Sequence, residues 1–169
     1  MTLQEYVDSL KGRRIAVLGI GVSNTPLIDL LLKNELPLTV CDMRSEEALG
    51  DTAAQLRAHG AELRLGPGYL DDLEGFDYIF RTPGLLPIDP ALVAAKERGA
   101  VVTSEMEVFF QLCPCRTIGI TGSDGKTTTS SIIAELLKAA GLRVHLGGNI
   151  GKPLLTEIPD FRPEDIAVL

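Results

Sequence analysis

The sequence predicts an α/β fold built from parallel strands. Short runs rich in β-branched and aliphatic residues recur about every twenty residues, and helix-like segments separate most of them. Strands that alternate with helices at this spacing are typical of parallel βα units, whose crossovers are right-handed. A glycine-rich stretch follows two of these runs, at residues 19–24 and 119–125.

The predicted strands are short. They occupy residues 14–19, 37–42, 61–66, 77–82, 100–104, 116–121 and 143–148. The last residues, 165–169, are a further apolar run that we interpret as a buried strand.

Boundary signals mark the first two clear helices. Thr25 and Pro26 supply an N-cap and a proline at the first helical position, and an apolar stripe follows at Leu27, Leu30 and Leu31. Asp89 and Pro90 open another helix, which Gly99 closes.

A third helix follows Lys126 and ends before Gly141. Its predicted apolar face consists of Ile132, Ile133, Leu136, Leu137 and Ala140.

Composition excludes some functions. At 169 residues, 45% of them hydrophobic, the chain can bury a substantial core. The net charge of −7 argues against nucleic-acid binding, which uses clustered Lys and Arg. The chain has no apolar run long enough for a bilayer and no basic leader, so we expect no membrane partner and a cytoplasmic location. Cys41, Cys113 and Cys115 lack paired spacing and are interpreted as reduced thiols.

The stretch GITGSDGKTTTS, residues 119–130, lies between a predicted strand and a predicted helix. A glycine-rich turn in this position exposes backbone N–H groups at the positive end of the helix dipole, where they bind phosphate oxygens. Lys126 adds a charge for the terminal phosphates of ATP, and the Thr127 hydroxyl suits Mg²⁺. The predicted ATP-binding residues are Gly122, Ser123, Asp124, Gly125, Lys126, Thr127 and Thr128, with Lys126 and Thr127 as catalytic residues and Thr127 as the metal ligand.

This loop departs from the common pattern G-x-x-x-x-G-K-[ST] at one position. Ile120 stands where the pattern requires glycine, with Gly119 and Gly122 on either side of it. We therefore interpret the stretch as a variant phosphate-binding loop.

The other glycine stretch, GIGVSN at residues 19–24, follows the first predicted strand. It resembles the dinucleotide fingerprint G-x-G-x-x-G, although Asn24 stands where the third glycine allows close helix packing. Asp42 ends the next strand at about the distance at which such folds bind a ribose. The residues alone leave three interpretations open: a nicotinamide cofactor, a structural glycine turn, or another nucleotide.

The string GITGSDGKTTTS, followed by GGNIGKPLL, resembles the ATP site of the Mur ligase family, which builds the peptide of bacterial cell-wall precursors. The resemblance extends through GIGVSN, RTPGLLPIDP and TSEMEVFFQL and so covers nearly the whole chain. It implies a Rossmann-like N-terminal domain that holds the uridine diphosphate of the substrate rather than a redox cofactor. The motifs look most like those of members that add D-glutamate to UDP-N-acetylmuramoyl-L-alanine.

The resemblance also implies which residues bind the uridine nucleotide. They are Gly21, Val22, Ser23 and Asn24 in the turn facing the diphosphate, Asp42, Met43 and Arg44 beside the uracil, Thr82, Pro83 and Gly84 in a further substrate-lining loop, and Asn149 near the sugar and phosphate. Without the resemblance, Ser23 would be interpreted as a helix-capping hydroxyl and Arg44 as a solvated surface charge.

The chemistry implied is amide synthesis driven by ATP with Mg²⁺. The substrate carboxylate takes the γ-phosphate to give an acyl phosphate, which the amine of D-glutamate displaces. A carboxylate must approach a polyanion, so charge has to be neutralised, a task for Lys126 and the metal. Two other classes stay open: a different P-loop enzyme such as a small kinase, and a module that binds a nucleotide without chemistry.

The expected organisation is a Rossmann-like substrate domain at residues 1–114 and the first part of a central P-loop ATPase domain at residues 115–169. P-loop enzymes place a magnesium-binding acid at the end of a later strand, and none follows Leu169. We therefore expect a portion of a longer ligase that is inactive alone. Its second half is expected to expose apolar surface at Ile132, Ile133 and residues 166–169.

Overall fold

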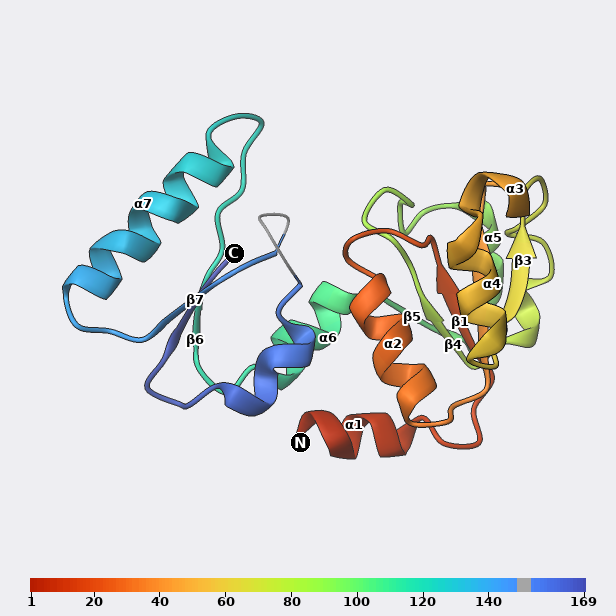
Figure 1. Ribbon diagram of the computed structural model, residues 1–169, viewed down its shortest axis with the longest axis horizontal. Helices are drawn as coiled ribbons and strands as arrows, with labels where there is room; N and C mark the ends of the chain where they lie inside the picture. The colour runs from red at the N-terminus through yellow and green to blue at the C-terminus, as the bar shows by residue number, and fades with distance from the viewer. Residues whose placement is uncertain (149–152) are drawn as a thin grey trace.

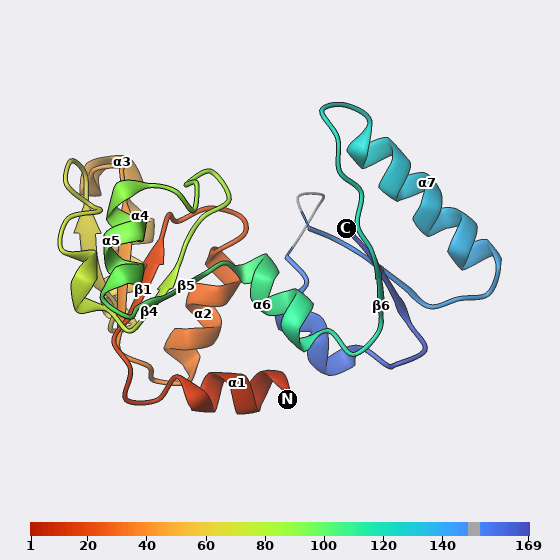
Figure 2. The same ribbon diagram turned by 180° about the vertical axis from the view of Figure 1, so that it is seen from behind.

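The computed structural model describes residues 1–148 and 153–169 and confirms the predicted α/β class. The described residues form two separate parallel sheets, with helix α6 lying between them (Figures 1 and 2). Within these residues, no helix combines the length and the apolar character needed to cross a membrane.

Helices and strands alternate along the chain as predicted. In order they are α1 (Leu3–Ser9), β1 (Ile15–Leu18), α2 (Thr25–Lys33), β2 (Leu38–Asp42), α3 (Glu46–Leu49), α4 (Asp51–Ala58), β3 (Glu62–Leu65), η1 (Leu73–Gly75), β4 (Tyr78–Phe80), α5 (Pro90–Glu97), β5 (Val101–Thr103), α6 (Glu105–Leu112), β6 (Arg116–Ile118), α7 (Lys126–Ala139), β7 (Val144–Leu146), η2 (Leu155–Asp160) and β8 (Ile166–Val168). Each predicted strand is present but shorter than predicted, because the glycine, threonine and proline residues that follow several strands turn away into loops.

The first sheet has the order β3-β2-β1-β4-β5, and all neighbouring strands are parallel. Successive residues of β1 point to opposite faces: Ile15 and Val17 join a cluster with α1 and α2, whereas Ala16 and Leu18 join a cluster with α5. Burial on both faces explains why this strand is apolar throughout. The strand order reverses between β1 and β4, and open α/β sheets bind ligands at such a switch point, outside the carboxyl ends of the strands.

The second sheet has the order β6-β8-β7, also parallel. The expectation that residues 166–169 are exposed is wrong, because β8 is the central strand of this sheet. Ala167 and Val168 are fully buried, and Ile166 and Leu169 are partly buried.

Helix α7 covers this sheet with a different face from the one predicted. Its fully buried residues are the small Ser130 and Ala134, and Ile133 and Leu137 beside them are partly buried. Ile132 and Leu136 are 55% and 65% exposed, and Ala140 is exposed too. The predicted face was too wide, because the helix approaches the sheet through small side chains rather than through its largest ones. The predicted exposure of Ile132 is confirmed.

The sequence predicted the start of α5 correctly and the start of α2 one residue too late. The Asp89 carboxylate accepts the backbone N–H of Ala91 at 3.0 Å, as an N-cap does. Helix α2, however, starts one residue earlier than predicted, with Asn24 at the N-cap position. The Thr25 hydroxyl donates to the carbonyl of Gly21 at 2.9 Å instead of accepting a helix N–H.

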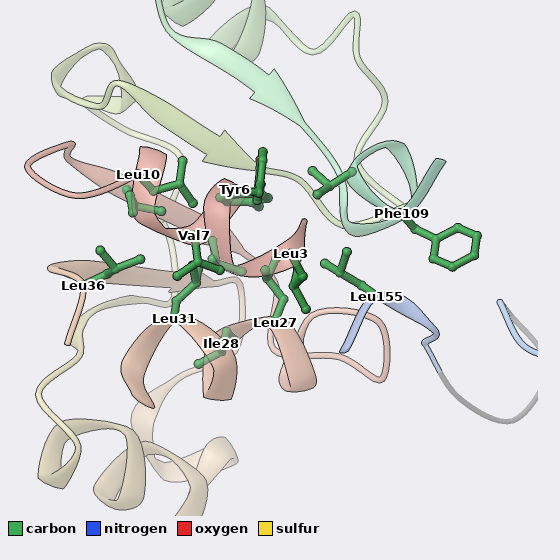
Figure 3. Packing of buried hydrophobic residues seen from close by; sticks show 14 of the residues in the cluster. Leu3, Tyr6, Val7, Leu10, Leu27, Ile28, Leu31, Leu36, Phe109 and Leu155 are labelled. Atoms are coloured by element: carbon green, nitrogen blue, oxygen red, sulfur yellow. The ribbon is translucent and has the colours of Figure 1, made fainter. Parts of the chain in front are cut away.

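One hydrophobic cluster joins the two sheets. Leu155 in η2 and Phe109 in α6 belong to the same buried cluster as Leu3 in α1 and Leu27 in α2. Figure 3 shows Leu155 beside Leu3 and Leu27. The buried Glu105 carboxylate of α6 also accepts the backbone N–H of Leu155 at 3.2 Å. The segment η2, which precedes the central strand β8 of the second sheet, is therefore anchored on helices of the first sheet, which fixes the two sheets relative to each other.

Candidate functional site

Three loops meet at the carboxyl edge of the first sheet. They follow β1, β2 and β4 and carry the predicted residues 21–24, 42–44 and 82–84. A cavity of about 250 Å³ opens between them, and its lining includes Gly21, Asp42, Met43, Arg44 and Thr82. The structure thus brings together residues that lie far apart in the sequence.

Gly19 allows two of these loops to approach closely. Its φ is +91°, and a Cβ added there would lie 3.1 Å from Cβ of Thr82. Its backbone N–H donates to the carbonyl of Cys41 at 2.7 Å, which ties the start of the loop to β2. A side chain at this position would push the Thr82 loop away from the glycine turn.

Asp42 borders the cavity, but its carboxylate is buried and hydrogen-bonded within the protein. One carboxylate oxygen accepts the backbone N–H and the Nε–H of Arg44, both at 2.9 Å. The other accepts the Ile20 N–H at 2.7 Å and Arg44 Nη2 at 2.8 Å. These four bonds use about all the acceptor sites that a carboxylate has. Asp42 therefore orients Arg44 and the glycine turn, and a ligand hydroxyl would compete with these bonds for its oxygens.

The electrostatics agree with this arrangement. Burial alone would raise the pKa of Asp42, but the hydrogen bonds from Arg44 and from the Ile20 N–H outweigh it and lower the pKa to about 2. The side-chain hydrogen bond to Asp42 and the charge of that carboxylate raise the pKa of Arg44, whose side chain is 47% exposed at the cavity. Arg44 is thus a charged group whose backbone N, Nε and Nη2 are held by the protein, while about half of its side chain is exposed to solvent.

Asn24 also turns inward. It is fully buried, and its Nδ2 donates to the carbonyls of Leu18 at 2.9 Å and Gly19 at 3.0 Å. Its Oδ1 has no hydrogen-bond partner among the described residues. Asn24 therefore holds the turn in place of the missing third glycine, while Val22 before it is 74% exposed and Ser23 is partly buried.

The second glycine loop joins β6 to α7. Gly125 has a φ of +74° and precedes Lys126, the first residue of the helix. A Cβ added at Gly119 or Gly125 would meet no atom within 4 Å. The loop therefore presents open space in front of a helix N-terminus, the arrangement that binds phosphate groups.

Lys126 lies back over this loop. Its ammonium group donates to the carbonyls of Gly122 and Ser123, the latter at 3.1 Å. The predicted residues Ser123, Asp124, Thr127 and Thr128 are exposed around it. Lys126 thus has a defined position over the loop, where a phosphate group would compete with the two carbonyls for its protons.

A cavity of about 640 Å³ separates the two sheets at the glycine loop. Helix α7 contributes Lys126, Thr127 and Ser130 to its lining, and the loop after β4 contributes Arg81 and Pro83. The Arg81 side chain is only 14% exposed and is held by Glu107 Oε1 at 3.2 Å and by the carbonyl of Leu85 at 3.3 Å. A second basic side chain, paired with Glu107, therefore lines the same cavity as the loop lysine.

Sequence reasoning missed Arg81, Glu107 and Phe110 as lining residues. Arg81 directly precedes the predicted loop at 82–84, and the other two lie in the stretch TSEMEVFFQL. Nothing in their spacing indicates a cavity, because only the packing of α6 between the sheets turns them toward the loop. Asn149 lies outside the described residues.

The described residues offer little for a metal by themselves. Among them no group of three or more His, Cys, Asp or Glu side chains could hold a metal ion. The Thr127 hydroxyl and the Glu107 carboxylate line the same cavity, although Glu107 is already paired with Arg81. A hard cation such as Mg²⁺ would need phosphate oxygens as further ligands.

These features define an α/β protein of two parallel sheets with a glycine loop facing the cleft between them. The chain belongs to the Mur ligase family. The family's MurD-like N-terminal domain matches residues 13–104, and its middle domain matches residues 120–166.

Curated relatives match over almost the whole chain. The UDP-N-acetylmuramoylalanine--D-glutamate ligase of Clostridium novyi (strain NT) is 48% identical over 168 residues, which cover 99% of this chain and 37% of that protein. The enzyme of the same name from Acetivibrio thermocellus is 47% identical over 167 residues, covering 99% and 36%. The chain therefore spans a little over a third of the length of these relatives. A solved pseudomurein peptide ligase type C from Methanothermus fervidus is 26% identical, with a TM-score of 0.45, over 94% of this chain and 32% of that one.

Proposed function

We propose that this chain forms the uridine-nucleotide and phosphate-binding portion of an ATP-dependent ligase that adds D-glutamate to UDP-N-acetylmuramoyl-L-alanine. The names of the relatives at 47% and 48% identity support this assignment. The structural observation behind it is the cavity of about 640 Å³, because it joins the glycine loop to the carboxyl edge of the first sheet. A ligase that activates one substrate with a phosphate from another needs such a shared space.

The phosphates of ATP would be held by the backbone of residues 122–125 and by Lys126. The open space at Gly125, the helix N-terminus behind it and the defined position of the ammonium group all fit a polyphosphate. Thr127 would supply a hydroxyl ligand to Mg²⁺, with the remaining ligands coming from phosphate. When bound, ATP would supply the phosphate that converts a carboxylate into an acyl phosphate.

The uridine diphosphate would occupy the cavity of about 250 Å³. Arg44 and the exposed Met43 would face the base, and the turn at residues 21–23 would face the diphosphate. Asp42 would act on Arg44 rather than on the ligand, since its acceptors are used within the protein.

This chain's own residues would mainly position and neutralise charge. Lys126 and the Arg81–Glu107 pair line the same cavity, and a carboxylate and a polyphosphate must meet in such a space. Placing them together would lower their mutual repulsion before any bond forms.

We propose further that residues 1–114 form the substrate domain and residues 115–169 belong to the ATPase domain. The division of the strands between the two sheets supports this proposal, because β1 to β5 form one sheet and β6 to β8 form the other. We also propose a cytoplasmic location, where ATP is available.

The binding proposal is tested by titrating UDP, NAD and ATP separately into the labelled chain and following amide chemical shifts. We expect UDP to shift amides around Ser23 and Arg44, and ATP to shift those of residues 122–128. Stronger binding of NAD than of UDP would overturn the uridine assignment. Binding of ATP alone would favour a different P-loop enzyme, and binding without any turnover in the longer protein would favour a nucleotide-sensing module.

Catalysis is tested on a protein of the full length of the relatives. Phosphate release from ATP should require both UDP-N-acetylmuramoyl-L-alanine and D-glutamate. Release that needs neither substrate, or that accepts another amino acid equally well, would contradict the proposed reaction.

A further inference from the structure

Two cysteines meet at the connection between the sheets. Cys113 follows the last residue of α6, and Cys115 precedes the first residue of β6, so the segment Cys113–Cys115 joins the two elements. Their sulfur atoms lie 3.5 Å apart. The sequence spacing C-x-C alone did not indicate this contact, because nearby cysteines can point in opposite directions.

The surroundings hold each thiol in place. The Cys113 N–H donates to the carbonyl of Phe109 at 2.8 Å, which ends α6, and Pro114 restricts the backbone between the two cysteines. Cys115 directly precedes Arg116, which pairs with Ile166 of β8, the central strand of the second sheet. One thiol is thus anchored to α6 and the other to the second sheet.

The exposure of the cysteines separates this pair from the third thiol. Cys113 and Cys115 are both partly exposed, whereas Cys41 is fully buried in β2. A small oxidant therefore reaches the pair more readily than it reaches Cys41.

We propose that Cys113 and Cys115 form a reversible dithiol–disulfide pair at this connection, oxidised by a peroxide or by a low-molecular-weight disulfide. With peroxide, the Cys113 thiolate attacks one oxygen, becomes a sulfenic acid and releases hydroxide. The Cys115 thiol then attacks the Cys113 sulfur, the S–O bond breaks, and water leaves as the S–S bond forms. In total two thiols and one peroxide give one disulfide and two waters, and two equivalents of a thiol reductant reverse the oxidation.

The order of these steps follows from the environment. Burial and the neighbouring Cys113 thiol raise the pKa of Cys115, which disfavours the Cys115 thiolate. We therefore assign Cys115 the resolving step, and the single variants test this order.

Geometry makes the bridge reversible rather than structural. The sulfur atoms must close from 3.5 Å to the roughly 2.05 Å of a disulfide bond. A bridge across a single residue closes a small ring, and strained disulfides are the labile and regulatory ones. Such a small loop also removes little entropy from the unfolded chain, so oxidation should change the midpoint of thermal unfolding very little. Its effect should be to stiffen the segment that joins α6 to β6.

The experiment uses the folded, fully reduced chain, treated with hydrogen peroxide or with oxidised glutathione in separate samples. Remaining thiols are alkylated under denaturing conditions, and the masses of the tryptic peptides are measured by mass spectrometry. Residues 99–116 form one peptide that contains both cysteines. We expect this peptide to lose two hydrogens and take up no alkylating agent, while Cys41 stays alkylatable. Treatment with dithiothreitol should restore two alkylatable thiols in the peptide.

Single variants test the assigned order. In Cys115→Ser, Cys113 should give a sulfenic acid that dimedone traps; in Cys113→Ser, Cys115 should react more slowly than Cys113 does in the other variant. Cys41→Ser should leave the bridge unchanged. Two results would overturn the proposal: a peptide that keeps both thiols at oxidant levels that modify Cys41, or bridges that form only between chains. The wild-type mass measurement decides the matter even if a variant folds poorly.

Discussion

Arg44 is held by Asp42 through both its backbone and its side chain. The Asp42 carboxylate accepts the Arg44 N–H, Nε–H and Nη2–H within 2.9 Å, and Arg44 Nη2 also donates to the carbonyl of Ile20 at 2.6 Å. The loop after β2 is thereby fixed to the loop after β1 before any ligand arrives. A guanidinium held in this way loses little side-chain entropy when it binds a ligand.

Asp42 should make stability depend on acid pH. Its folded pKa of about 2 lies below its ordinary value of 3.8, so its contribution is complete above the ordinary value and is lost as pH falls from about 4 to about 2. The shift corresponds to about 2 kcal/mol. In urea unfolding at pH 7, Asp42→Asn should lower the free energy of unfolding by about this amount. When pH is lowered to 3, the free energy of unfolding should fall less in Asp42→Asn than in wild type. Asp29→Asn, at an exposed carboxylate on α2, is the control and should behave like wild type.

Arg44→Ala should weaken UDP binding by about tenfold or more, because a hydrogen bond to a charged group typically contributes about 1.5 to 3 kcal/mol. Isothermal titration at neutral pH measures this. The matched control is Arg57→Ala, which removes an arginine of similar exposure that pairs with Glu46 on a neighbouring helix. Equal losses in both variants would point to a general charge effect instead of a site at Arg44.

Lys126→Ala should remove most ATP affinity, by roughly tenfold to a hundredfold, and leave UDP affinity unchanged. The two ligands are predicted to use different loops on different sheets. Lys138 lies in the last turn of the same helix and is paired with Glu135. Lys138→Ala is therefore the control and should change neither affinity. A loss of both affinities in Lys126→Ala, with the fold intact by circular dichroism, would contradict the picture of two sites.

Gly19→Ala should destabilise the protein by about 1 to 3 kcal/mol. An alanine there must adopt a φ near +91° and must displace Thr82, whose Cβ would lie at 3.1 Å. Gly21→Ala is the control two residues away, because an added Cβ meets nothing within 4 Å there. Denaturant midpoints measure both. If the Gly21 variant were as unstable as the Gly19 variant, the loss of stability would come from any substitution in this loop rather than from the close approach of Gly19 to Thr82.

The sequence by itself determined the fold class and the positions of the strands. The spacing of apolar residues and the composition of a segment are local properties, so the strands at 15–18, 38–42 and 144–146 could be predicted within a few residues. The glycine loop before Lys126 was predictable for the same reason, since strand, turn and helix follow one another directly. Family resemblance, rather than periodicity, singled out Arg44 and Ser23.

Only the tertiary structure decided which side chains face a ligand and which face the protein. Asp42 and Asn24 stand at positions that predict ligand contact, yet both are buried and hydrogen-bonded to the backbone of the glycine turn, because its polar groups need partners. The sequence pattern also could not tell which stripe of α7 is buried, since Ile132 and Ile133 are equally apolar and the sheet accepts only the side with Ser130 and Ala134. The meeting of Arg81 and Lys126 in one cavity, and the contact between Cys113 and Cys115, depend on how α6 packs between two sheets, and long-range packing leaves no local signal in the chain.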